Sequence, residues 1–69
     1  MTKLGELSIG KRIKAARIMR SMTQGELARR ADISQGYLSQ VELGERTPRD
    51  EVVELIQHAL GVDFDSDEQ

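Results

Sequence analysis

The sequence contains no cysteine and no long apolar run. The absence of cysteine excludes disulfides, cysteine-ligated zinc and thiol catalysis, and it fits a reducing cytoplasm. No stretch approaches the roughly 20 apolar residues that a membrane-spanning helix needs. Residues 1–11, MTKLGELSIGK, also lack the apolar segment of a signal peptide. We therefore expect a cytoplasmic protein that does not act at a membrane.

Aromatic and basic residues are each missing from large parts of the chain. Tyr37 and Phe64 are the only aromatic residues among 69, so the core of one small domain has to be aliphatic. Residues 1–49 hold ten Lys and Arg against five acidic residues, a net charge of +5, whereas residues 50–69 hold seven acidic residues and no Lys or Arg, a net charge of −7. This asymmetry indicates a basic binding face and an acidic rear or tail, although ordinary solvated helix faces can segregate in the same way.

Apolar residues recur at helical spacing in four stretches, which predict helices at about 8–21, 24–31, 34–43 and 50–60. Polar residues precede three of these stretches as N-cap candidates, and glycines follow two of them; these residues are Ser8, Thr23, Ser34, Gly44 and Gly61. Thr23 and Glu26 have the spacing of a capping box. The pattern predicts an all-α, compact bundle of four to five short helices.

The two central helices are joined by a very short break at residues 31–33. A turn this tight needs a residue in the left-handed region, which Asp32 tolerates better than most residues. Leu27 on one helix and Leu38 on the next bury one face of each helix against the other. Two helices crossing steeply through such a turn form a helix-turn-helix.

This region resembles the Cro and phage-repressor (XRE) type of helix-turn-helix DNA-binding domain. The matching motifs, in chain order, are Ile9-Gly10-x-Arg12-Ile13-x-x-x-Arg17, Thr23-Gln24-x-Glu26-Leu27-Ala28, Ile33-Ser34, Tyr37-Leu38-Ser39-x-Val41-Glu42-x-Gly44-x-Arg46-x-Pro48 and Ala59-Leu60-Gly61-Val62. The resemblance implies a lambda-repressor-like domain at residues 8–62, between an N-terminal arm (1–7) and an acidic C-terminal tail (63–69). Relatives usually continue with a fifth helix that carries paired leucines, which residues 62–69 lack.

By this resemblance the chain is expected to regulate transcription, as a repressor that binds a palindromic operator on double-stranded DNA as a homodimer. Helix 34–43 is then the recognition helix in the major groove. Its outer face is short, polar and uncharged, whereas a merely solvated helix more often carries Lys and Glu. The base-reading candidates are Gln35, Gly36, Tyr37 and Gln40. Glutamine binds the adenine edge through two hydrogen bonds.

Contacts to the DNA backbone are expected from residues around this helix. Gln24 lies at a helix N-terminus, where free N–H groups and the helix dipole attract a phosphate. The complete set of backbone candidates is Thr23, Gln24, Ser34, Ser39, Arg46 and Arg49. The resemblance also implies a structural ion pair between Arg17 and Glu42.

Other functions remain open for the same fold. An antitoxin or a restriction-modification controller would add a protein partner (a toxin or effector of unknown identity) or an autoregulated operon, and a protein-interaction module would not bind DNA at all. No carboxylate forms a convincing catalytic constellation with His, Ser or Lys, and no phosphate-binding loop occurs, so we expect no enzyme. His58 has no companion ligand, and no metal or cofactor is expected. The resemblance places the protein in a prokaryotic or phage setting, at the nucleoid.

Overall fold

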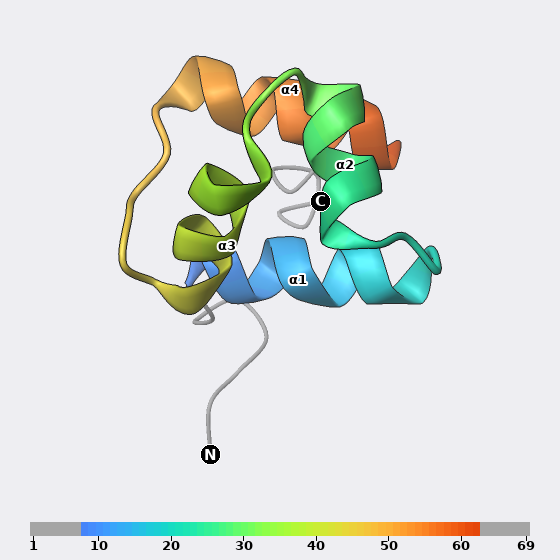
Figure 1. The fold of residues 1–69 in the computed structure, drawn as a ribbon, viewed down its shortest axis with the longest axis horizontal. Helices are drawn as coiled ribbons and strands as arrows, with labels where there is room; N and C mark the ends of the chain where they lie inside the picture. The colour runs from blue at the N-terminus through green and yellow to red at the C-terminus, as the bar shows by residue number, and fades with distance from the viewer. Residues whose placement is uncertain (1–7, 63–69) are drawn as a thin grey trace, which may run out of the picture.

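The computed structural model describes residues 8–62, which form four helices and no strand. The helices are α1 (Ile9–Met19), α2 (Gln24–Ala31), α3 (Gln35–Leu43) and α4 (Asp50–Leu60). Figure 1 shows α1 along one side of the bundle and α4 along the opposite side, with α2 and α3 between them. The all-α prediction is confirmed. The arm (1–7), the acidic tail (63–69) and any fifth helix lie outside the described residues.

An aliphatic core holds the four helices together, with each helix contributing at least one fully buried side chain. The largest fully buried side chains are Ile13, Leu27, Leu38, Val41, Ile56 and Leu60. The apolar stripe of α4 is wider than this core, since Leu55 remains 47% exposed. Among residues 8–62, no helix is both long enough and apolar enough to cross a membrane.

Side-chain caps explain where three of the helices begin. The hydroxyl oxygens of Ser8, Thr23 and Ser34 accept hydrogen bonds from backbone N–H groups three residues later, at 3.3, 3.0 and 3.0 Å. Of the expected Thr23–Glu26 capping box, the structure of residues 8–62 shows this half. The Glu26 side chain instead accepts a hydrogen bond from Arg30 at Oε2, at 2.9 Å. α4 starts after Arg49, whose side chain makes no capping bond.

Left-handed residues explain where the helices end. Asp32, Gly44 and Gly61 close α2, α3 and α4 with φ of 60°, 83° and 73°. α1 ends at Met19, two residues earlier than predicted, because Ser21 also adopts a positive φ of 56°. This turn carries Met22 into the core at 9% exposure, whereas Met19 is 84% exposed.

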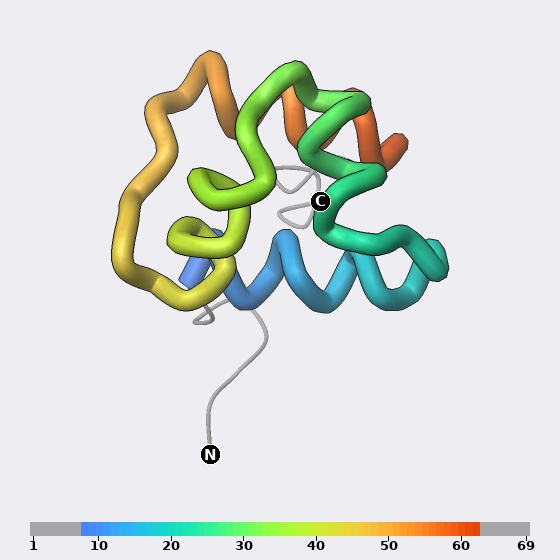
Figure 2. The backbone as a smooth tube through the Cα atoms, viewed as in Figure 1, coloured from blue at the N-terminus to red at the C-terminus, as the bar shows by residue number. Residues whose placement is uncertain are grey.

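α1 and α3 approach each other closely at Gly10. A Cβ atom at this position would overlap the carbonyl oxygen of Val41 on α3, so only glycine fits without a shift of the helices. The tube in Figure 2 shows the segment 44–49, which runs along the edge of the bundle from the end of α3 to the start of α4. Pro48 is buried within this segment.

Candidate nucleic-acid interface

The α2–α3 pair forms the helix-turn-helix. Asp32 in the left-handed conformation reverses the chain, and the N–H of Ile33 donates to the carbonyl oxygen of Ala28 at 2.9 Å. Leu38 and Val41 then anchor α3 in the core with no exposed surface. Because one side of α3 is fixed in this way, its opposite side has to face solvent.

The solvent side of α3 carries polar groups without formal charge. Gln35 and Gly36 are exposed, and Ser39 and Gln40 are partly exposed. The one charged residue of α3, Glu42, is turned inward and only 6% exposed. A Cβ atom at Gly36 would have no heavy atom within 4 Å, so the helix backbone is openly accessible there. Such a surface can approach base edges without placing a like charge near phosphates.

Tyr37 lies at the border of this surface and is partly buried against the hydrophobic core. Its side chain therefore helps to hold α3 against the core. Gln35 lies beside α2, since its Oε1 is 3.4 Å from the position that a Cβ atom of Gly25 would take. The start of α3 is thus held next to the start of α2.

Glu42 connects α3 to both α1 and α2. Arg17 donates from Nε to Oε2 at 2.8 Å and from Nη2 to Oε1 at 3.0 Å, which gives the bidentate geometry of strong arginine–carboxylate pairs. Nη1 of Arg17 also donates to the carbonyl oxygen of Met22 at 2.8 Å. Gln24 adds a further bond, from its Nε2 to Oε1 of Glu42 at 3.0 Å. No buried side-chain polar atom of residues 8–62 lacks a partner.

Gln24 therefore already uses its side-chain amide in a hydrogen bond within the domain. Its side-chain amide is bound to Glu42, which sequence reasoning missed because the two residues lie 18 positions apart. Its backbone N–H remains in the first turn of α2, where N–H groups have no acceptor within the helix. The hydroxyls of Thr23 and Ser34 accept capping bonds, yet each retains a hydrogen that can be donated to a phosphate oxygen.

Gln40 and Arg46 are joined at the far end of α3. Nε of Arg46 donates to Oε1 of Gln40 at 3.0 Å, and the backbone N–H of Arg46 reaches the carbonyl oxygen of Gln40 at 3.3 Å. Arg49, the last backbone candidate, is exposed at the N-cap of α4 and shares no hydrogen bond with the other candidates among residues 8–62.

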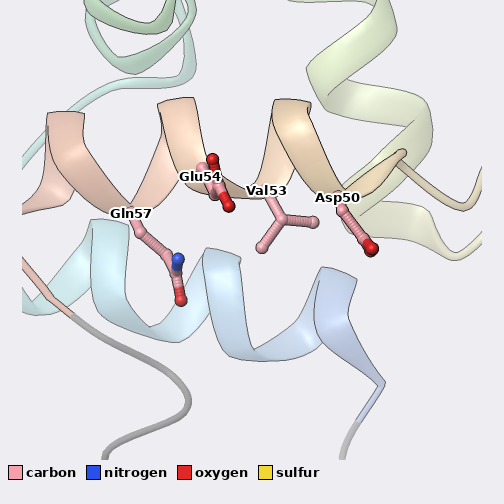
Figure 3. A pocket seen from close by; sticks show the side chains of 4 residues that line it. All are labelled: Asp50, Val53, Glu54 and Gln57. Carbon is pink, nitrogen blue, oxygen red and sulfur yellow. The ribbon is translucent and has the colours of Figure 1, made fainter.

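A concave region lies on one side of α4. It has a volume of about 250 Å³ and is lined by Asp50, Val53, Glu54 and Gln57. Figure 3 shows these side chains along one side of α4. Two of the four are carboxylates, so the pocket repels a phosphate backbone, in agreement with the charge asymmetry of the sequence.

Comparison with known proteins agrees with the helix-turn-helix geometry of α2 and α3. The model of the helix-turn-helix family matches residues 13–66. An immunity repressor protein of Bacillus phage phi105 is 38% identical over 56 residues, which are 81% of this chain but 39% of that protein. The chain thus spans about two fifths of the length of this relative.

Two solved structures are also similar. The clp gene regulator ClgR from C. glutamicum has a TM-score of 0.82 and 29% identity, covering 94% of this chain and 84% of that chain. The wild-type restriction-modification controller protein C.Esp1396I has a TM-score of 0.80 and 26% identity, covering 94% and 87%. The chain therefore belongs to the helix-turn-helix family, as a DNA-binding domain of the Cro and phage-repressor (XRE) type.

Proposed function

We propose that this chain is a sequence-specific transcriptional regulator, which represses by occupying a palindromic operator as a homodimer. It acts at the prokaryotic or phage nucleoid, in the cytoplasm. The observation that carries the proposal is the solvent side of α3, where Gln35 and Gln40 present amide groups from a helix that the core holds in place. In this reading α3 lies in the major groove.

Phosphate contacts on both sides of α3 set its register. The first turn of α2, with Thr23 and Gln24, supplies N–H groups and a hydroxyl at one side, and Arg46 with Arg49 supplies positive charge at the other. Ser34 and Ser39 add hydroxyl donors on α3 itself. Such contacts fix the orientation of the domain on the duplex but carry no sequence information, which has to come from the amides and from the backbone at Gly36.

Dimerisation would raise the affinity of a domain that covers only one half-site. Two half-sites one helical turn apart would be read by two copies related by a twofold axis. The large exposed apolar side chains of the described residues are Ile18, Met19, Leu43 and Leu55, and Leu55 extends the apolar stripe of α4. This stripe supports a dimer surface on α4.

Selection of bound sequences from a random DNA library tests the proposal directly. The wild-type chain is expected to enrich a palindrome, and Gln40→Ala is expected to relax the preference at one position in each half-site. Glu51→Gln on the exposed side of α4 is a control that should leave the enriched sequence unchanged. If the wild type enriches nothing and binds DNA only weakly at low salt, the chain is a protein-interaction module instead.

A second candidate is a restriction-modification controller. The observation that favours it is the match to the controller C.Esp1396I, whose chain is covered over 87% of its length. The two functions share the DNA contacts but differ in the operator's location. Binding upstream of a neighbouring endonuclease gene would favour the controller, and binding at a phage promoter would favour the repressor.

A further inference from the structure

The hydrogen bond between Arg46 and Gln40 fixes which end of the Gln40 amide faces Arg46. Arginine carries only hydrogen-bond donors, so the end of the Gln40 amide that faces Nε of Arg46 has to be the oxygen. The NH₂ group of Gln40 therefore lies at the opposite end of the planar amide group. A glutamine held in this way offers two N–H donors to its surroundings, while its oxygen already uses one of its two lone pairs on Arg46.

The backbone reinforces this arrangement. Gly44, with φ of 83°, ends α3 and turns the chain so that the N–H groups of Glu45 and Arg46 both point at the carbonyl oxygen of Gln40, at 2.9 and 3.3 Å. Arg46 is thus bound to Gln40 through its main chain and its side chain together. Both side chains touch solvent, so the side-chain bond adds little to stability, but on DNA, where water is excluded, it decides which end of the amide is available.

We propose that Arg46 sets the base preference of Gln40, so that Gln40 selects guanine over adenine. This inference rests on the proposed function. Guanine shows two acceptors in the major groove, N7 and O6, and both suit the NH₂ group of Gln40. Adenine shows one acceptor and one donor, N7 and N6–H₂, and its donor would have to share the Gln40 oxygen with the positively charged guanidinium of Arg46. The usual pairing of glutamine with adenine is thereby disfavoured.

Arg46 contributes to DNA binding in a second way without giving up this bond. Only the Nε group of Arg46 donates to Gln40. The Nη1 and Nη2 groups of Arg46 have no acceptor among residues 8–62. One hydrogen of Nη1 and one of Nη2 form a fork at the end of the guanidinium, and this fork suits a phosphate oxygen pair. Arg46 can therefore bind a phosphate and hold the base-reading amide of Gln40 at the same time. In this role it is a positioning residue for Gln40.

The test compares Arg46→Met with Arg49→Met by library selection and by competition binding. Each variant removes one positive charge, so both should bind more weakly and show a salt slope reduced by about one. Only Arg46→Met should change sequence preference, at the position that Gln40→Ala identifies. The ratio of guanine to adenine there should fall about tenfold or more, since one good bidentate contact discriminates by about that factor.

A double variant completes the cycle. With Gln40→Ala in place, Arg46→Met should lower affinity but change no preference. The proposal is overturned if Gln40→Ala alters no position, if the wild type already prefers adenine there, or if Arg46→Met weakens binding with an unchanged preference. In these three cases an enriched operator leaves the proposed function standing. If the wild type enriches no sequence at all, both proposals fall.

Discussion

Arg17 and Glu42 face each other through two parallel hydrogen bonds of 2.8 and 3.0 Å between α1 and α3. Their side chains are 11% and 2% exposed, so the pair is largely withdrawn from water. A buried pair of this kind is weak support for net stability, because desolvation offsets much of the attraction. Removing one partner is costly, since the other charge then stays buried alone.

Arg17→Met should lower the free energy of unfolding by about 3–5 kcal/mol, because it leaves the Glu42 carboxylate with Gln24 as its remaining partner. Urea denaturation followed by circular dichroism measures the loss. Arg30→Met is the matched control, since Arg30 pairs with Glu26 at 2.9 Å but at 56% and 31% exposure. The control should change stability by about 1 kcal/mol or less. Equal losses in the two variants would contradict the difference in burial.

Gly10→Ala should destabilise the fold by about 1–3 kcal/mol, because the new methyl group overlaps the carbonyl oxygen of Val41 and forces α1 and α3 apart. The same substitution elsewhere on a helix normally stabilises it. Thermal unfolding of Gly10→Ala and Ala15→Gly, at an exposed site of the same helix, separates packing from helix propensity. A stable Gly10→Ala protein would show that the two helices can separate at no cost.

Gly36→Ala should have opposite effects on stability and on DNA binding. The site is open, with no atom within 4 Å of an added Cβ, so helix propensity can raise the free energy of unfolding by up to about 1 kcal/mol. If the backbone of α3 approaches DNA at Gly36, the same methyl group should weaken operator binding about tenfold or more, because it holds the helix away from the bases. Fluorescence anisotropy measures binding, and unchanged affinity would remove Gly36 from the interface.

Ser34→Asp should separate the capping role of this residue from its contact with phosphate. Aspartate is as good an N-cap as serine, and it can accept the hydrogen bond that Ser34 now receives from the N–H of Tyr37. The melting temperature should therefore change little. Operator affinity should fall, because a carboxylate next to a phosphate is repelled. Ser8→Asp, at the N-cap of α1, is the control that should leave both quantities unchanged.

The boundaries of α2, α3 and α4 could be predicted from the sequence because strong local signals lie at their ends. Thr23, Asp32, Gly44 and Gly61 each act through their own backbone or through a residue three positions away. α1 ends two residues before the predicted residue 21, since Ser21 adopts a positive φ without the glycine that normally signals such a turn. Local sequence signals therefore predict the boundaries of α2, α3 and α4 well, and the end of α1 less well.

The partners of the site residues could not be predicted in the same way. The bond from Gln24 to Glu42 depends on how α2 packs near the end of α3, and the exclusion of a side chain at Gly10 depends on how closely α1 approaches Val41. The bond from Arg46 to Gln40 depends on the path of the segment after Gly44. Among these long-range partners, the sequence predicts only the Arg17–Glu42 pair, and that prediction rests on the family resemblance rather than on spacing. The DNA contacts of the base-reading and backbone candidates stay predictions.

The sharing of Glu42 by Arg17 and Gln24 has a thermodynamic consequence. Because one carboxylate fastens α1, the start of α2 and the end of α3 to each other, the groups that would meet phosphate and those that would meet bases already hold fixed relative positions before DNA arrives. Docking such a rigid body requires little loss of conformational entropy within the domain. The heat capacity change of operator binding should then reflect the surface buried at the interface, with no added contribution from folding of α3.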